Sequence, residues 1–442
     1  MTKHSVHIDE ELCKGCTNCL KRCPTEAIRV RGGLSHATAK INELLCIDCG
    51  ECIRRCPHHA KLAVCNPLSE SLPRDEFKHI VVLPPPALYA QYNNLEDKGI
   101  VNQALLRLGF DAVFEVAAAA EIISEKTREI IKGQKRTGGE SLLPLISSAC
   151  PAVLKLIQIR FPTLVPHILP LCAPVTLAAQ TARREESKRM GISPSDIGVV
   201  FLTPCPAKVT AVRDHSEPME KIDRVVSVSD IYKLLPPIME EISLESVGDD
   251  IVSEPTDYIE SSEVTAAGKI GIGWGSSGGE SAGLLSDSYL AADGIENVLQ
   301  VLEELEDGRL PTLDYIELNS CPGGCVGGVF TVENPFIART KLNVLRKYLP
   351  VAGYRHITET SDISATFTEL PRTAEYSLTE ALRLVRLEEE LYARLPGLDC
   401  GCCGSPTCRA FAVDVVKGEV ETEACIKLRS ENQCLSHEVP PL

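Results

Sequence analysis

The residues that could do chemistry begin with three short segments that place cysteine beside proline or glycine. They are Ser148-Ala149-Cys150-Pro151, Thr203-Pro204-Cys205-Pro206 and Ser320-Cys321-Pro322-Gly323-Gly324-Cys325. Thiolates are soft ligands, and four of them suit one 4Fe–4S cluster. The paired glycines let the backbone fold tightly and come close to whatever the sulfurs hold. The alternative is three unrelated buried cysteines and a turn. We predict that four cysteines hold a single cluster: Cys150, Cys205, Cys321 and Cys325.

The first 66 residues carry one cysteine spacing twice, Cys-x-x-Cys-x-x-Cys-x-x-x-Cys-Pro. This is the signature of bacterial ferredoxins with two 4Fe–4S clusters, in which the fourth cysteine of each run ligates the other cluster. One cluster is therefore predicted to use Cys13, Cys16, Cys19 and Cys56. The other is predicted to use Cys46, Cys49, Cys52 and Cys23. A zinc module is the alternative, and Cys65, outside the pattern, is expected to be structural.

A further cysteine group follows a charged helix that we expect at about residues 379–395. Its spacing, Cys-x-x-Cys-x4-Cys-x16-Cys, supplies four thiolates to one more metal site. We favour 4Fe–4S over zinc because the chain already carries iron–sulfur motifs. The predicted ligands are Cys400, Cys403, Cys408 and Cys425. Cys402 is an alternative ligand, and Cys434 is expected to take no part.

Composition limits the classes of function. The 442 residues are 44% hydrophobic and 24% charged, which is ordinary for a soluble globular protein of several domains. The formal charge of −16 argues against nucleic acid as a partner, because phosphate binding needs a basic surface. Twenty cysteines in tight spacings, with no apolar leader and no run that could span a membrane, indicate metal ligands in a reducing cytoplasm.

The elements that must position these cysteines alternate between strand and helix, which is α/β patterning. Strands are expected at 79–84, 111–116, 142–146, 197–202 and 315–318, and helices at 102–108, 117–131, from 151, from 206 and at 339–349. Residues 67–79 are expected to be a linker, and the acidic stretch 240–265 an irregular surface insertion.

Two of the predicted ligand cysteines lie between an expected strand and an expected helix. Cys150 and Cys205 each end an expected strand and precede a proline that opens a helix. The helix N-terminus offers unpaired N–H groups and partial positive charge, which favour a thiolate. The stretch 269–279 contains one G-x-G-x-x-G motif, but without a convincing βαβ context we favour a loop closing over the metal site to a dinucleotide site.

The three central segments resemble the signature loops of [FeFe]-hydrogenases, and the resemblance covers residues 80–375. The ferredoxin-like start is a frequent accessory in that family, and the cysteine group near the end resembles the 4Fe–4S module of its sensory branch. The resemblance implies a two-lobed α/β domain with helices around small mixed or parallel sheets. An N-terminal α+β ferredoxin domain and a small, mainly helical C-terminal domain would accompany it. We place the three domains at 1–70, 78–375 and 376–442.

The family's active site is the H-cluster, a 4Fe–4S cube joined to a diiron unit with CO, CN⁻ and azadithiolate ligands. By resemblance Cys150, Cys205, Cys321 and Cys325 match the cube ligands, and Cys325 matches the cysteine that bridges to the diiron unit. Lys208 matches the lysine that holds a cyanide ligand, as a cationic donor near an anion should. The cofactors implied are four 4Fe–4S clusters, two N-terminal, one in the H-cluster and one C-terminal, with the diiron unit.

The sequence departs from the family pattern at the residue that relays protons. Highly active members have two adjacent cysteines in the first loop, and the first of them relays protons; here that position is Ala149. Alanine cannot carry a proton, so the usual acid/base step is missing. The loop at 278–281 also lacks the family's methionine, and a substitute relay through water or Glu280 is a hypothesis.

The resulting hypothesis is a slow, sensory-type hydrogenase that splits H₂ heterolytically and passes electrons to the N-terminal clusters, the C-terminal cluster or both. Its partners would be H₂, protons and a redox or signalling protein such as a ferredoxin, with a homodimer as one candidate assembly. The alternatives are a non-catalytic protein like the hydrogenase-related iron–sulfur assembly factors, and a pure electron-transfer subunit.

Overall fold

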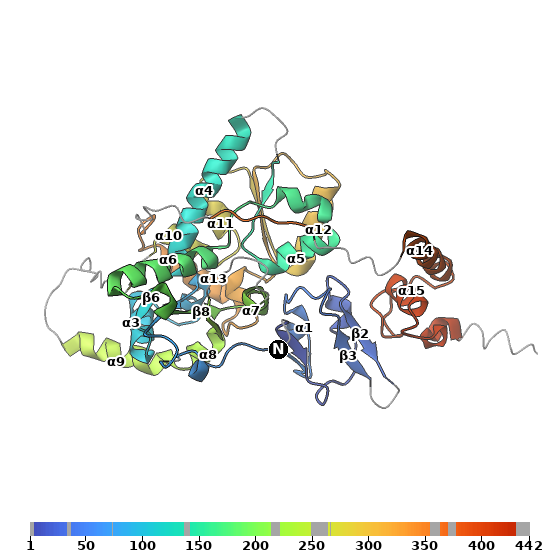
Figure 1. The fold of residues 1–442 in the computed structure, drawn as a ribbon, viewed down its shortest axis with the longest axis horizontal. Coiled ribbons are helices and arrows are strands. Elements are labelled where there is room, and N and C mark those ends of the chain that lie inside the picture. The colour runs from blue at the N-terminus through green and yellow to red at the C-terminus, as the bar shows by residue number, and fades with distance from the viewer. Residues whose placement is uncertain are drawn as a thin grey trace, which may run out of the picture. The chain divides into compact units, whose positions relative to one another are not determined.

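The computed structural model of the protein describes residues 4–32, 37–72, 74–136, 142–213, 222–248, 264–265, 267–353, 363–369 and 377–429 (Figure 1). The chain forms two compact units. Unit 1 contains Met1–Ser5, Ile47–Gly50 and Val64–Glu369. Unit 2 contains Val6–Cys46, Glu51–Ala63 and Leu370–Leu442. The expected domain boundaries remain a prediction, and Cys434 lies outside the described residues.

Unit 1 is built on two parallel sheets. The larger has the order β10-β6-β5-β8-β9 and the smaller the order β11-β12-β7. Its two central strands, β5 and β8, are buried along their whole length, as their unbroken apolar sequences require in a parallel sheet covered on both faces. The strands are β5 (His79–Leu83), β6 (Ala112–Phe114), β7 (Leu145–Ile146), β8 (Ile197–Thr203), β9 (Arg224–Ser227), β10 (Val264–Thr265), β11 (Tyr289–Asp293) and β12 (Tyr315–Asn319).

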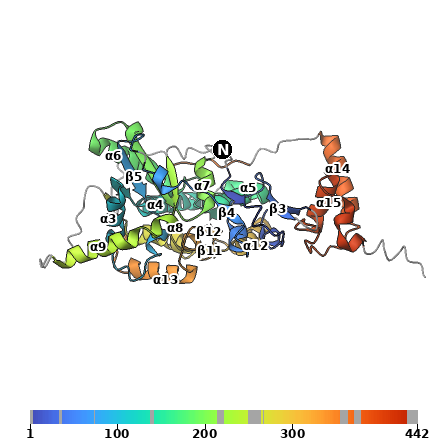
Figure 2. The ribbon, with the colours of Figure 1, turned by 90° about the horizontal axis from the view of Figure 1, so that it is seen from below.

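Helices pack on both sheets, which confirms the α/β class (Figure 2). On the larger sheet α6 packs against β5 and β8, while α3 packs against β6 and α9; on the smaller sheet α12 packs against β11 and β12. The helices are α2 (Pro86–Tyr89), α3 (Gly99–Leu108), α4 (Val116–Arg136), α5 (Pro151–Arg160), α6 (Pro174–Met190), α7 (Pro206–Arg213), α8 (Val228–Tyr232), α9 (Leu235–Gly248), α10 (Lys269–Gly273), α11 (Gly279–Gly283), α12 (Ile295–Glu306) and α13 (Pro335–Arg346).

Two expectations about local structure were wrong. The acidic stretch 240–265 was expected to be irregular, but its start belongs to α9, which continues to Gly248 because its Leu, Met and Glu residues favour a helix and α3 provides a surface to pack on. Residues 249–263 of that stretch lie outside the described residues. Cys150 was expected to end a strand, but β7 stops at Ile146 and a short loop separates the two. The proline after each cysteine does open a helix, α5 at Pro151 and α7 at Pro206.

Unit 2 contains most of the ferredoxin-like region and the C-terminal segment. Two antiparallel pairs, β1 with β4 and β2 with β3, carry the first of these. The elements are β1 (Val6–Ile8), β2 (Ile28–Arg31), β3 (Thr38–Ile41), β4 (Lys61–Ala63), α1 (Glu51–Arg54), α14 (Leu378–Tyr392) and α15 (Cys408–Val416). The helix expected at 379–395 is α14, which packs against α15.

The duplicated cysteine runs have matching backbones. Glu26 and His59, each three residues after the fourth cysteine of its run, both have positive φ, at 53° and 51°. The next residue in each run donates its backbone N–H to that cysteine's sulfur: Ala27 to Cys23 at 3.2 Å and Ala60 to Cys56 at 3.3 Å. The segments that follow the fourth cysteine therefore have the same local backbone geometry in the two runs.

None of the described helices is both long and apolar enough to cross a membrane.

Candidate metal centre

One cavity in unit 1 collects the residues predicted for the central cluster. Cys150 lies at the N-cap of α5, Cys205 lies between β8 and α7, and Cys321 and Cys325 follow β12. All four line the cavity together with Lys208 and Ala149. These six residues come from three segments, and the first and last of the six, Ala149 and Cys325, are more than 170 positions apart in the sequence. They are brought together by the tertiary structure.

Close backbone contacts join the region of Cys321 and Cys325 to the glycine-rich stretch 269–279 and to the Pro204 loop. The N–H of Ser277 donates to the carbonyl of Gly323 at 2.9 Å, and the N–H of Phe330 donates to the carbonyl of Pro204 at 3.0 Å. Gly324 has a φ of +90°, and a Cβ there would lie 2.5 Å from the Ser277 nitrogen. A Cβ on Gly328 would lie 2.1 Å from the Pro204 carbonyl oxygen. Glycine is therefore required where the loops meet.

The glycine-rich stretch 269–279 forms part of this wall. Its residues make α10, a tight turn and the start of α11, and no strand, which is not the βαβ context of a dinucleotide site. Trp274 and Gly275 line the cavity, and Gly275 accepts a hydrogen bond from the Val326 nitrogen at 2.9 Å. The stretch closes over the cavity, as the sequence interpretation favoured.

Burial in the cavity favours the neutral thiol form of two of its cysteines, Cys205 and Cys325. Burial raises the pKa of the Cys325 thiol to about 12, with the charge of Lys208 acting in the opposite direction. Burial likewise raises the pKa of Cys205 well above its usual range. Because thiolates are the ligand form, a cationic metal group must supply the charge that stabilises them. Four convergent thiols in a largely apolar pocket are the donor set that a 4Fe–4S cluster uses.

An acidic pair lies at the same cavity. Glu280 and Glu317 both line it, and Glu280 is only 5% exposed. Ser147 donates to Glu280 at 2.8 Å to Oε2, and Tyr315 also donates to it. Burial, followed by the neighbouring charge of Glu317, raises the pKa of Glu280 to about 8, although the hydrogen bonds and Lys208 oppose the rise. Such a carboxyl exchanges protons near neutral pH.

Sequence reasoning named Glu280 only as a hypothesis and missed the other polar groups. Ser147 lies two residues before Ala149 and accepts the Ala149 N–H at 3.2 Å, which ties Glu280 to the first cysteine loop. Glu317 accepts the N–H groups of Gly278 and Ser281, each at 2.9 Å, so that it positions the loop that carries Glu280. The available signal was a glutamate inside the otherwise apolar strand β12.

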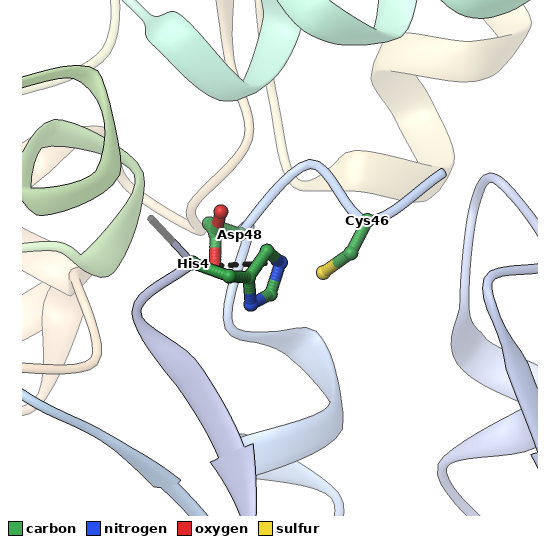
Figure 3. A group of neighbouring side chains, drawn as sticks. All are labelled: His4, Cys46 and Asp48. Carbon is green, nitrogen blue, oxygen red and sulfur yellow. Dashed lines mark ion pairs between the residues drawn. The ribbon is translucent and has the colours of Figure 1, made fainter. Parts of the chain in front are cut away.

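Part of the second ferredoxin run belongs to unit 1 and reaches the cavity. Asp48 and Cys49 line it beside Cys150 and Cys205. Asp48 is held by His4, whose Nε2 lies 3.2 Å from Asp48 Oδ1 (Figure 3), and by the Ser5 hydroxyl at 3.2 Å. The third residue drawn in Figure 3, Cys46, is the first cysteine of that run. Within unit 1, a predicted ligand of the second ferredoxin cluster thus faces the central cavity.

Two further cavities lie in unit 2. The first is lined by the ligand set predicted from the crossover rule, Cys13, Cys16, Cys19 and Cys56, and also by Lys61. The second is lined by the predicted C-terminal ligands Cys400, Cys403, Cys408 and Cys425, and also by Cys402. Cys408 opens α15, where Thr407 caps the helix by accepting the Ala410 N–H at 3.0 Å, so the thiol lies at the positive end of the helix dipole.

The C-terminal cysteine segment packs on the ferredoxin-like strands within unit 2. Asp414 of α15 is 2% exposed and accepts bonds from Arg29 at 2.6 Å and Arg31 at 2.5 Å, both on β2. The backbone adds a bond from the Val30 N–H to the Gly404 carbonyl at 2.8 Å. Lys21, two residues after Cys19, donates to the Pro406 carbonyl at 3.1 Å. The two cysteine-lined cavities of unit 2 therefore belong to neighbouring, directly bonded segments.

The comparisons with known proteins agree with this arrangement. A model described as the iron only hydrogenase large subunit, C-terminal domain matches residues 78–286 and 282–329, more than half of the chain. The chain belongs to the iron-only hydrogenase family. A 4Fe-4S dicluster domain matches residues 5–59, and an Fe-S cluster family matches residues 395–426.

Individual relatives are distant from this hydrogenase-family chain. The periplasmic [Fe] hydrogenase large subunit of Nitratidesulfovibrio vulgaris is 27% identical over 74% of this chain and 86% of its own. The cytosolic iron-sulfur assembly component 3 of Bos taurus is 22% identical over 52% of this chain and 56% of its own. A variant of [FeFe]-hydrogenase HydA1 from Chlamydomonas reinhardtii has a TM-score of 0.45 at 17% identity, covering 72% of this chain and 94% of that chain.

Proposed function

We propose that this protein is a slow, H₂-responsive [FeFe]-hydrogenase of the sensory type. The observation that carries the proposal is the central cavity, where four cysteines and Lys208 surround a space walled by apolar and polar groups, with Ala149 at the usual proton-relay position. The cavity therefore offers the ligands of an H-cluster without the cysteine on which fast turnover in the family depends. Slow turnover suits a protein that reports H₂ better than one that produces it.

The chain's own residues have separate tasks in this proposal. Cys150, Cys205 and Cys321 would hold the 4Fe–4S cube, and Cys325 would hold it and bridge to the diiron unit. Lys208, whose Nζ lies 3.3 Å from the Ala149 carbonyl, would donate a charge-assisted hydrogen bond to a cyanide ligand. When bound, the H-cluster supplies the heterolytic splitting of H₂. The largely apolar lining would exclude water and strengthen each polar contact inside.

Glu280 is the residue best placed to move the proton in place of a cysteine at position 149. It is buried, lines the same cavity, and is linked to the Ala149 loop through Ser147. A pKa of about 8 lets its carboxylate accept a proton during H₂ oxidation and return one during H₂ formation. Tyr315 and Ser147 hold its oxygens in one orientation by donating hydrogen bonds to them.

Electrons would leave through the ferredoxin-like clusters. Cys49, a predicted ligand of the second of these clusters, lines the central cavity, which favours transfer between that cluster and the cube. The N-terminal clusters and the C-terminal cluster would supply either two electron exits or one exit and one redox signal. We expect the recipient to be a ferredoxin or a signalling protein, in the cytoplasm.

The second candidate is an iron–sulfur protein without the diiron unit. It is favoured by the relative among assembly components, which matches half of this chain at an identity close to that of hydrogenase relatives. Such a protein would fill the cysteine sites with cubes and leave the rest of the cavity unused. Lys208 and the buried Glu280 would then have no reacting group to serve.

Infrared spectroscopy tests the proposal. The chain is reconstituted with iron and sulfide without oxygen, exposed to a synthetic diiron precursor, and compared with its Cys325→Ala variant. Bands of protein-bound CO and CN⁻ that shift under H₂, and that the variant lacks, would support the hydrogenase. If the four cubes were filled and no such bands formed, the second candidate would replace it.

A further inference from the structure

Lys61 is a buried basic residue for which the described residues of unit 2 provide no hydrogen-bond partner. The residue is 2% exposed, and its Nζ is buried with no hydrogen-bond partner among the described residues. An unpaired buried ammonium is costly, because taking the charge out of water is repaid only by an opposite charge or by hydrogen bonds. A group that the described residues do not supply must therefore balance Lys61.

The place of Lys61 indicates what that group is. Lys61 lines the same cavity as Cys13, Cys16, Cys19 and Cys56, the ligand set predicted for the first ferredoxin cluster. It begins β4, five residues after Cys56, and β4 is fixed by antiparallel pairing with β1. A 4Fe–4S cluster with four thiolate ligands is an anion, and its sulfurs accept hydrogen bonds. The cluster is the counterion that the buried ammonium lacks.

The duplication provides an internal reference. In the second half of the pattern, Lys61 follows Cys56-Pro57-His58-His59-Ala60; in the first half, Ile28 follows Cys23-Pro24-Thr25-Glu26-Ala27. The matching φ angles and N–H···S bonds of the two segments make the two positions equivalent. Ile28 is also 2% exposed, and it follows Cys23, a ligand predicted for the other cluster, as Lys61 follows Cys56. One cluster thus faces an ammonium where its duplicate faces an alkyl chain.

We propose that Lys61 donates to the cluster of Cys13, Cys16, Cys19 and Cys56 and makes it the easier of the two ferredoxin clusters to reduce. Reduction adds one electron, and therefore one negative charge, to the cluster without breaking a bond. A fixed cation beside it stabilises the reduced state more than the oxidised state, because the attraction grows with the charge. Charge and hydrogen bonds at the sulfurs are among the factors that set such potentials.

The proposal predicts which of the two ferredoxin clusters holds an added electron. Within unit 1, Cys49, a predicted ligand of the second cluster, lines the central cavity. Within unit 2, the loop predicted to hold the first cluster ends at Cys19, two residues before Lys21 and its bond to the C-terminal segment. An electron that enters this pair of clusters would therefore rest on the first. This inference needs the ferredoxin clusters only and would survive a failure of the proposed hydrogenase activity.

The test is a potentiometric titration of the full chain with its cubes reconstituted, reduced stepwise with dithionite and followed by electron paramagnetic resonance. In Lys61→Met, one of the components of the unaltered protein should become harder to reduce by at least about tenfold in the one-electron equilibrium constant, or about 59 mV. Lys14→Met is the matched control, because Lys14 lines the same cavity but is exposed and its Nζ bonds the Glu11 carbonyl. Water screens that charge, so a shift below about twofold is expected.

A reciprocal variant covers the case in which Lys61→Met fails to keep its cluster. Ile28→Lys should make a different component easier to reduce by a similar factor, and iron and sulfide contents report whether each variant is fully loaded. The inference is overturned if fully loaded Lys61→Met titrates like the unaltered protein. It is equally overturned if Lys61→Met loses its cluster and a loaded Ile28→Lys shows no shift.

Discussion

The central cavity of unit 1 and the C-terminal cavity of unit 2 are each lined by four predicted ligand cysteines, but they are built in different ways. The C-terminal cysteines lie within residues 400–425 of one continuous segment. The central cysteines come from three distant segments, whose backbones meet at glycines, and they share their cavity with Lys208, Glu280 and Glu317. A cluster that only passes electrons needs ligands and a wall. A site that also moves protons needs positioned acids, which a single short segment cannot supply.

The sharpest way to test this difference is to remove one cysteine from each site. Under the proposed function, we expect Cys325→Ala to abolish H₂-dependent reduction of a soluble dye, because the diiron unit would lose its protein ligand. Cys408→Ala should lose the C-terminal cluster and yet retain dye reduction, since the dye accepts electrons without it. Iron content and dye reduction are the measurements. Equal losses of turnover in the two variants would contradict the division of tasks.

Removing the acid of the central cavity should have the next largest effect. Glu280→Gln keeps the shape and should reduce turnover by about 10²–10⁴-fold, the usual contribution of a positioned acid or base. The infrared bands of the loaded protein should remain, because Glu280 is not a ligand. The exposed Glu304→Gln, which breaks only a surface pair with Arg309, is the control.

The pH dependence of turnover follows from the same residue. In the proposed mechanism, H₂ oxidation would need the carboxylate form of Glu280 as proton acceptor, so its rate should rise as the pH increases through about 8. H₂ formation needs the protonated form, so its rate should fall over the same range. Both transitions should be absent from the residual activity of Glu280→Gln. An unchanged profile in that variant would assign the proton step to another group.

The docking of the C-terminal segment within unit 2 can be broken at Asp414. Asp414→Asn removes the charge that Arg29 and Arg31 share and should weaken the packing by about 3 kcal/mol, the usual cost of leaving buried charges without their partner. Limited proteolysis should then release the C-terminal segment more readily. Glu390→Gln, which loses an exposed pair with Arg386 on α14, should behave as the unaltered protein. Equal resistance of both variants would show that Asp414 does not hold the segment.

The smallest expected effect is a loss of stability when a single methyl group is added where two cysteine loops meet. Gly328→Ala forces a Cβ to within 2.1 Å of the Pro204 carbonyl oxygen and should destabilise the fold by about 1–3 kcal/mol. Gly133→Ala makes the same chemical change on α4, where a Cβ meets nothing within 4 Å, and should stabilise the helix by about 0.5–1 kcal/mol. Thermal unfolding of the loaded proteins measures both, and shifts of the same sign would contradict the close approach.

Much of this arrangement could be predicted from sequence. The ferredoxin pattern, the C-terminal group and the three hydrogenase-like loops are recognised by cysteine spacing, because ligands in one short segment must keep the spacing that the metal geometry demands. The family and the α/β class are confirmed. The ligand sets stay predictions, although the cysteines of the central, first ferredoxin and C-terminal sets each line one cavity.

Residue type and local spacing are enough to identify the residues that could be ligands, because metal coordination depends on both. The surroundings of these ligands depend on the tertiary fold. The sequence does not tell what a glutamate in β12 or a lysine at the start of β4 contacts. Their roles follow from their burial, because a charged group removed from water needs a partner. The fold determines which partner lies near it.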